Sequence, residues 1–592
     1  VSLSKGELIA MSDQPPTFPP RSPAKPLAHV RRWDFRLAAI VLGLLPLVLA
    51  ELALRVAGIA EPASGTDALA GFNRQLRLFE PVGDRWQTIR SREPFFQPQS
   101  FAAVKPANGY RVFCFGGSTV YGHPYLADTA FPKWLELELA ATQPGRRTEV
   151  VNCGGISYAS YRLAPIVREV LGHQPDLVVL ALGHNEFLED RTYQPLKARS
   201  AARRWWEDRL SSLRLVTLFR GWLHAPVKDQ AIAGDGGLPL EVHARLDDAT
   251  GYASYHRDPK WHAQVIAQFE ENFRAMLAAC RAAKVPVLIV TLGSNMRDCP
   301  PFKSEHRAGL SVEEELRWQA EFDAGTASER RDLKAALAHY EAAAKLDDQH
   351  ALLAFRLARC HDRIGNFEAA REHYLRAKEL DVCPLRMVEP VEAFQRRIAS
   401  ETQTPLVDAR RATEARSPQG IPGHDEFLDH VHPNVAGHQW IARAIAVTLA
   451  ETRLLPVADP WSGEARRAMY RAHLRMLPAS YFPNGLRRVE WLERWAKRAR
   501  LRDETEPADA RAHLHAGFRW LDLGDADAAW AEFQSAIKLR PESLAELLRH
   551  ADDLSEQGRG EAAAMLVRRL AELARDGETR QRMEATATGF LK

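Results

Sequence analysis

Short apolar segments alternate with helical patterns through the middle of the chain. The apolar runs are rich in β-branched residues, and most are followed by a longer stretch with apolar residues at helical spacing. The runs are YRVFCF (110–115), EVVNC (149–153), DLVVLALG (176–183), VPVLIVTLG (285–293) and PLVDA (405–409). The helical patterns cover 131–142, 161–172, 262–284 and 436–451. Because strands that alternate with helices form parallel sheets covered on both faces, the pattern predicts an α/β fold with a five-stranded parallel sheet.

A second pattern repeats at a fixed spacing. Ala336, Tyr340 and Ala343 recur 34 residues later as Ala370, Tyr374 and Ala377. After residue 505 a related pattern contains Gly524, Ala529, Phe533, Ala536 and Pro541. The spacing resembles that of tetratricopeptide repeats, helical hairpins in which small residues let paired helices approach closely. The resemblance implies a surface that binds a protein or peptide partner, although short arrays are also used purely as structure.

The N-terminal region contains one long apolar stretch. Residues 37–60 reach the ~20 residues that a membrane-spanning helix needs. The basic residues before it, Lys25, Arg31, Arg32 and Arg36, predict that the N-terminus stays in the cytoplasm. No small-residue cleavage site is evident. The sequence therefore predicts a retained signal anchor that crosses the inner membrane once and leaves the rest of the chain extracytoplasmic, in the periplasm; a buried core helix is the alternative.

These patterns divide the chain into successive segments. They are a disordered cytoplasmic tail (1–36), a transmembrane signal anchor (37–60), a linker (61–108), the first part of the α/β core (109–296), a helical insert with tetratricopeptide-like repeats (297–386), the second part of the core (387–455), a helical connector (456–505) and C-terminal tetratricopeptide-like repeats (506–592).

Composition narrows the function classes. Hydrophobic content of 46% and charged content of 26% are ordinary for globular proteins, and 592 residues suffice for several domains. The net charge is +3 and no dense basic patch is interleaved with aromatic residues, which argues against a nucleic-acid partner. The six cysteines form no CxxC pair, which argues against a zinc module.

Two glycines and a serine follow the first predicted strand, in VFCFGGSTVYG (112–122). Gly116 and Gly117 permit backbone angles that other residues resist, so that Ser118 is delivered at the start of the next helix. Ser118 alone could be a helix N-cap, or a nucleophile if a base accepts its proton. A phosphate-binding loop is excluded because no lysine follows at the GxxxxGK spacing.

Candidate partners for this serine lie in two other blocks. FLDHVHPN (427–434) supplies Asp429 and His432, spaced so that the carboxylate can hold one imidazole nitrogen while the other nitrogen meets Ser118. Asn185, in LALGHNEF (180–187), follows the third predicted strand and could donate its side-chain amide to an oxyanion. The Asp and His residues around Asp429 are not spaced as in HExxH, so no metal and no cofactor are expected.

These blocks, in this order, resemble the SGNH/GDSL hydrolase superfamily, in the GGST variant that also occurs among membrane-anchored relatives. The resemblance implies a flavodoxin-like three-layer core and an esterase, lipase, carbohydrate deacetylase or acyltransferase that works through an acyl-enzyme. Carried over to this chain, Ser118 is the nucleophile, His432 the general base and Asp429 its orienting partner. The family's Gly-Asp-Ser reads Gly-Gly-Ser here.

The resemblance also implies an oxyanion hole. Asn185 would be its side-chain donor. Counted from Asn152, the position of the usual oxyanion glycine falls on Ser157, whose backbone N–H would serve equally, but Gly154 or Gly155 could be the donor instead. Glu186 stands where the family usually has Asp.

The sequence therefore predicts a membrane-anchored, extracytoplasmic serine hydrolase, an esterase or deacetylase that acts on acyl esters, with an acylated envelope glycan as one candidate substrate. An acyltransferase would use the same three residues and is not distinguished from a hydrolase. A third interpretation is a non-catalytic scaffold in which tetratricopeptide-like repeats on a hydrolase fold recruit a protein partner.

Overall fold

The computed structural model describes residues 29–57, 77–188, 214–215, 251–456, 462–498, 509–574 and 576–591. The chain divides into two units, one made of residues 1–66 and 201–228 and the other of residues 67–200 and 229–592. Most of the predicted cytoplasmic tail lies outside the described residues.

Helix α1 (His29–Val56) covers most of the predicted membrane anchor. Glu51, a charge that interrupts the apolar stretch, accepts hydrogen bonds from the backbone N–H groups of Arg214 and Leu215, both at 3.0 Å. Among the residues described, no helix has both the length and the hydropathy that crossing a membrane requires. The membrane anchor therefore remains a prediction.

The second unit is built around the predicted five-stranded parallel sheet, which is confirmed. Its strands are β4 (Gly109–Gly116), β5 (Arg147–Gly154), β6 (Leu177–Ala181), β7 (Val287–Thr291) and β8 (Leu406–Asp408). They lie in the order β5-β4-β6-β7-β8, and every neighbouring pair is parallel. In this flavodoxin-like order the topological switch point lies between β4 and β6, and ligands bind at the carboxyl ends of the strands beside such a point.

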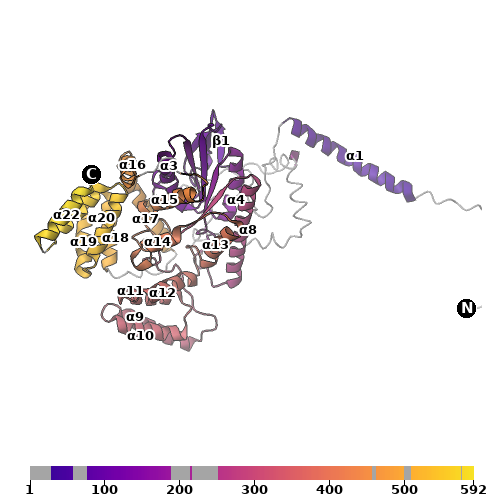
Figure 1. Ribbon diagram of the computed structural model, residues 1–592. Helices are drawn as coiled ribbons and strands as arrows, with labels where there is room; N and C mark the ends of the chain where they lie inside the picture. Colours follow the sequence, from indigo (N-terminus) through magenta and orange to yellow (C-terminus); the bar gives the residue numbers. More distant parts are fainter. Residues whose placement is uncertain are drawn as a thin grey trace, which may run out of the picture. The chain divides into compact units, whose positions relative to one another are not determined.

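Helices cover both faces of this sheet (Figure 1). The helices α3 (Phe131–Thr142) and α15 (Val435–Glu451) pack together on one face. The helices α4 (Ser160–Val170), α8 (Pro259–Ala282) and α13 (Glu389–Thr402) pack on the other. Every residue of β6 and β7 is buried, because a strand in the middle of a three-layer fold has no face toward water.

A small antiparallel sheet precedes the core, so residues 77–108 of the predicted linker (61–108) are folded, whereas residues 61–76 lie outside the described part of the chain. The sheet consists of β1 (Phe79–Val82), β2 (Arg85–Thr88) and β3 (Ser100–Ala102). The Phe101 ring lies 5.0 Å from that of Phe79 and 5.4 Å from that of Phe113 on β4. Residues 77–108 are therefore part of the packed core; their strands are too short to produce a recognisable alternation.

The helical insert forms two hairpins, α9 (Val312–Ser328) with α10 (Leu333–Leu346) and α11 (Ala351–Arg363) with α12 (Phe367–Leu380). All six residues of the 34-residue pattern are buried, three on α10 and three on α12. The pattern thus marks the packed faces of two successive hairpins. Their assignment to the tetratricopeptide class stays a prediction.

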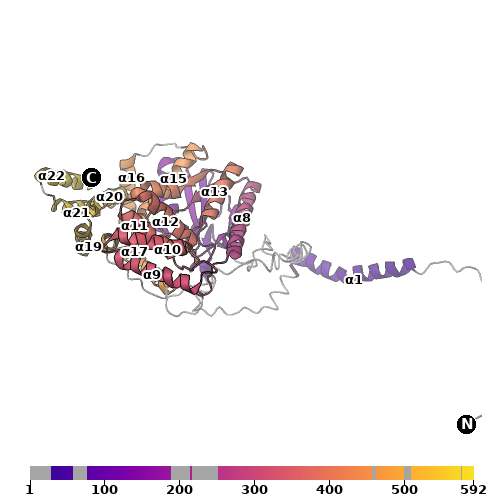
Figure 2. The ribbon, with the colours of Figure 1, turned by 90° about the horizontal axis from the view of Figure 1, so that it is seen from below.

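The C-terminal region is also helical, and α18–α22 lie at one end of the unit in both views (Figures 1 and 2). Its helices are α16 (Gly463–Arg475), α17 (Tyr481–Arg498), α18 (Ala510–Leu523), α19 (Ala526–Leu539), α20 (Ser543–Glu556), α21 (Gly560–Ala571) and α22 (Gly577–Gly589). The helices from α18 onward share a hydrophobic core of their own. Tyr470 of α16 donates a hydrogen bond to Glu138 of α3 at 2.6 Å, which ties this region to the α/β core.

Candidate active site

The last residue of β4 and the residue after it both stand where only glycine fits. A Cβ on Gly116 would lie 2.2 Å from the carbonyl oxygen of Ala181 on β6. A Cβ on Gly117 would lie 2.3 Å from the Asn185 amide nitrogen. Helix α2 (Ser118–Tyr121) begins directly after these two glycines. The glycines therefore let the first residue of α2 lie against the end of β6 and the Asn185 side chain.

Ser118, His432 and Asp429 are brought together in the second unit. The Ser118 Oγ lies 2.7 Å from the His432 Nε2, and the His432 Nδ1 lies 2.6 Å from the Asp429 Oδ2. His432 and Asp429 are 3% and 7% exposed, so the carboxylate–imidazole pair is shielded from water. With Nδ1–H donating to the carboxylate, Nε2 is left as the acceptor for the serine proton.

The local fold of residues 427–434 explains why Asp429 reaches His432. The Leu428 N–H donates to the His432 carbonyl at 2.9 Å, which closes a tight turn between them. The Asp429 Oδ1 accepts from the backbone N–H groups of Val431 and His432, both at 2.9 Å. Burial raises the pKa of the Asp429 carboxyl, but the imidazoles of His432 and His430 and these hydrogen bonds outweigh it and hold the pKa well below its usual range. Asp429 is therefore ionised and fixed in orientation.

Two donors lie beside Ser118. Asn185 follows β6, and its amide donates one hydrogen bond to the Tyr158 carbonyl at 3.1 Å, which orients the Nδ2 group. Ser157 has a positive φ of 62°, a backbone conformation that favours glycine and is found at strained functional positions. Both residues line the same cavity as Ser118.

Backbone hydrogen bonds discriminate among the candidate donors after β5. The Gly154 N–H donates to the Asn152 Oδ1 at 2.9 Å, and the Gly155 N–H donates to the Gly116 carbonyl at 3.0 Å. Within the described part of the chain, no protein acceptor takes the Ser157 N–H. Ser157 is therefore the member of this set that has a donor available for a ligand.

Glu186, which stands where the family usually has Asp, has a structural role. Its carboxylate accepts from the backbone N–H of Ser160 at 2.9 Å and from the Ser160 hydroxyl at 2.7 Å. Ser160 is the first residue of α4, so the negative charge lies at the N-terminus of that helix, where it is favourable. The longer side chain thus links the loop that carries Asn185 to α4.

The cavity at Ser118 is assembled from distant segments. It encloses about 570 Å³, open solvent at its mouth included. Its lining consists of Ser118, His123, Ile156, Ser157, Asn185, Leu188, Leu385, His430, Val431, His432, Trp491 and Leu492. The sequence pointed to Ser118, Ser157, Asn185 and His432, whereas Asp429 lies behind His432. The apolar lining residues were missed because they come from segments far apart in the sequence and no motif marks them.

Two further buried histidines, His123 and His184, lie near this site. The His123 ring centroid lies 4.9 Å from that of His432. Burial and the neighbouring imidazoles lower the pKa of His123 to about 3, and the same causes lower that of His184 to about 3. Both rings are therefore neutral at physiological pH and leave the carboxylate of Asp429 as the charge that orients His432.

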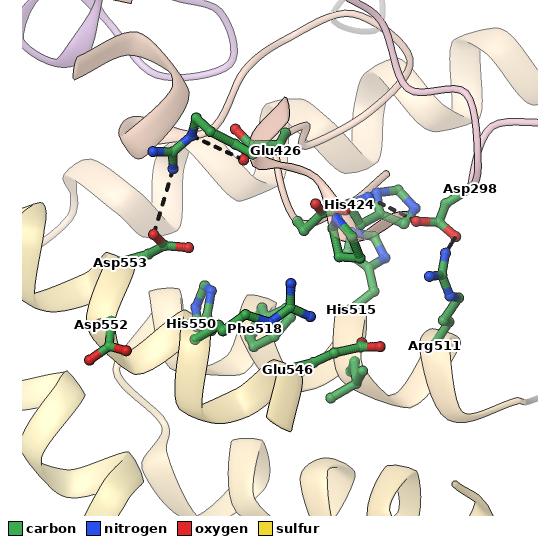
Figure 3. A pocket seen from close by; sticks show the side chains of 15 residues that line it. Asp298, His424, Glu426, Arg511, His515, Phe518, Glu546, His550, Asp552 and Asp553 are labelled. Atoms are coloured by element: carbon green, nitrogen blue, oxygen red, sulfur yellow. Dashed lines mark hydrogen bonds and ion pairs between the residues drawn. The ribbon is translucent and has the colours of Figure 1, made fainter. Parts of the chain in front are cut away.

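A second, larger cavity lies between the core and the C-terminal helices (Figure 3). It encloses about 970 Å³, open solvent included. Ion pairs cross it: Arg511 of α18 lies 3.1 Å from Asp298, and Arg416 lies 3.4 Å from Glu426 and 3.6 Å from Asp553 of α20. Over the described residues, no group of three His, Cys, Asp or Glu side chains is arranged to hold a metal ion. We call this the interface cavity and the one at Ser118 the triad cavity.

One comparison with known proteins assigns a family to part of the chain. Residues 114–353 match the model of the GDSL-like Lipase/Acylhydrolase family. The matched segment includes Ser118, Ser157 and Asn185 and ends before Asp429. The chain therefore carries a GDSL-like lipase/acylhydrolase domain, and the protein is an enzyme of the hydrolase class that acts on ester bonds. No curated protein matches the sequence.

Solved structures that are named as lipases or hydrolases show only distant similarity to this chain. A GDSL-like lipase from Bacteroides thetaiotaomicron VPI-5482 is 11% identical, with 58% of this chain and 89% of that chain covered and a TM-score of 0.24. An alpha/beta hydrolase enzyme from the metagenome of Lake Arreo, Spain, is 16% identical, with 60% of this chain and 98% of that chain covered and a TM-score of 0.24. The family assignment rests on the sequence match, because scores this low do not establish a shared fold.

Proposed function

We propose that the protein is a serine esterase in which Ser118 is the nucleophile, His432 the general base and Asp429 the residue that orients and stabilises the imidazolium. The observation that carries this proposal is the continuous set of short contacts from the Ser118 Oγ through the His432 ring to the Asp429 carboxylate, 2.7 Å and 2.6 Å long. The ionised, doubly hydrogen-bonded state of Asp429 supports it, because a fixed negative charge stabilises the protonated histidine.

The geometry supports a reaction in two halves. As Ser118 Oγ attacks the carbonyl carbon of the ester, His432 Nε2 takes the hydroxyl proton, and the carbonyl oxygen becomes an oxyanion that accepts from the Ser157 N–H and the Asn185 Nδ2. Collapse breaks the bond to the alcohol, which leaves with the proton from His432. Water then attacks the acyl-enzyme, His432 again accepts the proton, and the free acid departs as Ser118 regains it.

We also propose that this chemistry takes place outside the cytoplasm on acyl esters of the cell envelope, with acylated glycans among the candidates. The support is the apolar stretch 37–60 and the basic residues before it. An acyltransferase would differ only in the second half, where an alcohol replaces water as the acceptor. Partition of the full chain between membrane and soluble fractions checks the anchor, and recovery in the soluble fraction would contradict it.

The test of the proposed function is the variant Ser118→Ala in the full chain. We expect kcat for p-nitrophenyl butyrate to fall at least about a thousandfold, because the nucleophile is lost. A fluorophosphonate probe should label the wild type and not the variant. The matched control is Ser100→Ala, which removes an exposed serine on β3 and should change neither readout. Full turnover in the Ser118→Ala variant would remove this residue from the mechanism.

A further inference from the structure

One wall of the triad cavity comes from outside the α/β core. Trp491 and Leu492 line it together with Ser118, although they belong to α17 in the C-terminal region. We infer that α17 forms the acyl-binding wall of this enzyme, that Trp491 and Leu492 determine its chain-length specificity, and that its substrates carry an apolar acyl group longer than acetyl. The inference rests on the proposed function, since it assumes that the ester binds at Ser118.

Contacts with the loop after the nucleophile hold α17 in place. The Tyr481 hydroxyl accepts from the Leu126 N–H at 3.1 Å, and Arg488 donates to the Pro124 carbonyl at 2.7 Å. Gly485 lies so close to Tyr125 that a Cβ there would come within 2.2 Å of its ring. This loop directly follows α2, which begins with Ser118, so α17 is positioned against the nucleophile's own segment.

The spacing along α17 shows that this anchorage and the cavity wall belong to one helical face. Tyr481, Gly485, Arg488 and Leu492 follow one another at steps of four, three and four residues. Residues at these steps lie on one side of an α-helix. The anchored part of the helix thus carries Leu492, with Trp491 beside it, onto the triad cavity as a rigid extension.

The chemistry of the lining favours an apolar acyl group. Apart from the side chains at the reacting centre and the imidazoles of His123 and His430, the described lining is aliphatic or aromatic: Ile156, Leu188, Leu385, Val431, Trp491 and Leu492. No carboxylate, lysine or arginine is among these described lining residues. An acetyl group would contact little of this surface, whereas each further buried methylene is worth about a fourfold gain in kcat/KM.

The inference is tested with p-nitrophenyl acetate, butyrate and octanoate on the full chain. For the wild type we expect kcat/KM to rise from acetate to octanoate. In Trp491→Ala the octanoate-to-acetate ratio should fall at least about tenfold, because a large apolar contact is lost, whereas Trp491→Phe should keep most of it. The matched control is Trp520→Ala, at a tryptophan on α18 that is 40% exposed and not in the lining; its ratio should equal that of the wild type.

The outcomes separate this inference from the proposed function. If Ser118→Ala abolishes turnover while Trp491→Ala keeps the wild-type ratio, the proposed function stands and the acyl wall is wrong. A wild type that prefers acetate to octanoate also overturns the inference. If turnover survives in Ser118→Ala, the proposed function and the inference both fail. Circular dichroism checks the fold, and if Trp491→Ala does not fold, the octanoate-to-acetate ratio in Leu492→Ala decides by the same criterion.

Discussion

The triad cavity and the interface cavity both lie where the core meets the C-terminal helices, yet their chemistry is opposite. The triad cavity is walled by apolar side chains, by α17 and by the neutral imidazole of His123. The interface cavity, between the core and helices α18 and α20, is crossed by ion pairs. The larger opening is thus the more polar one, and the candidate chemistry lies in the smaller one. The contact between the core and the C-terminal helices therefore has two roles. Ion pairs in the interface cavity attach the helices to the core, and α17 helps to enclose the reacting groups in the triad cavity.

Two carboxyl groups three residues apart illustrate the difference. Burial raises the pKa of both Asp429 and Glu426. At Asp429 the imidazoles and two backbone N–H groups reverse the effect, so the pKa ends well below its usual range. At Glu426 burial, with help from Asp425 and Asp553, outweighs the single partner Arg416 and raises the pKa to about 8. The number of partners, and not burial alone, decides which carboxylate carries its charge into the interior.

The largest effect is expected at Asp429, the carboxylate behind His432. Asp429→Asn should lower kcat about 10⁴-fold, because the amide favours the wrong histidine tautomer and supplies no charge. Steady-state turnover of p-nitrophenyl butyrate measures it. The matched control is Asp425→Asn, which changes a carboxyl in the same loop that faces the interface cavity and should keep kcat within about threefold. Equal losses would mean that the two cavities are not separate in function.

The second-largest effect is expected from the residues that donate to the oxyanion. Asn185→Ala should lower kcat by about 10²–10³, the usual effect of removing one such donor. Gly117→Ala should act in the same direction, because its Cβ would lie 2.3 Å from the Asn185 amide nitrogen and displace it. The control is Gly145→Ala, where a Cβ meets nothing within 4 Å. Single-turnover kinetics separates this loss from weaker binding, and a change in KM alone would argue against the oxyanion role.

Breaking an ion pair of the interface cavity should change stability rather than turnover. Arg511→Leu leaves the Asp298 carboxylate, 16% exposed, without its guanidinium partner. The expected cost is about 1–3 kcal/mol in the free energy of unfolding, reduced from the fully buried case by partial exposure. Urea unfolding measures this cost, and kcat should stay near the wild-type value. A large loss of kcat in a stably folded variant would show that the interface cavity controls the triad.

The smallest expected effect is a pH dependence of stability that arises at Glu426. Its pKa rises from 4.5 to about 8 on folding, so the folded state binds more protons than the unfolded state between these values. This contribution is fully present below about pH 4.5 and is lost as the pH rises through about 8.

Glu426→Gln, which cannot ionise, should therefore gain stability relative to the wild type progressively as the pH rises from about 5 to about 8. Thermal unfolding across this range measures the difference. The control is Glu542→Gln, at an exposed position, which should show no such trend. A constant difference between the Glu426→Gln variant and the wild type would indicate that Glu426 ionises normally in the folded protein.

Sequence patterns alone predicted the strands of the parallel sheet. They also predicted that four polar residues lie close together in the fold: Ser118, Asn185, Asp429 and His432. A strand buried on both faces must be apolar along its whole length, and polar side chains that follow such strands meet at one edge of the sheet. Tight-turn spacing alone allowed Asp429 to be paired with His432. These inferences succeeded because each depends on neighbours close in sequence or on a general property of parallel sheets.

The features that the sequence did not predict depend on contacts between distant segments. Residues 77–108, expected to be a linker, pack on the core because Phe79 and Phe101 find Phe113 on β4. Ser157 is distinguished from its neighbouring glycines only by which backbone N–H groups already have acceptors. Trp491 lines the same cavity as Ser118 only because α17 is held against the loop that follows α2. A hydrogen bond or an apolar contact between remote residues leaves no periodic trace in the chain, so the triad could be anticipated while the shape of the cavity around it could not.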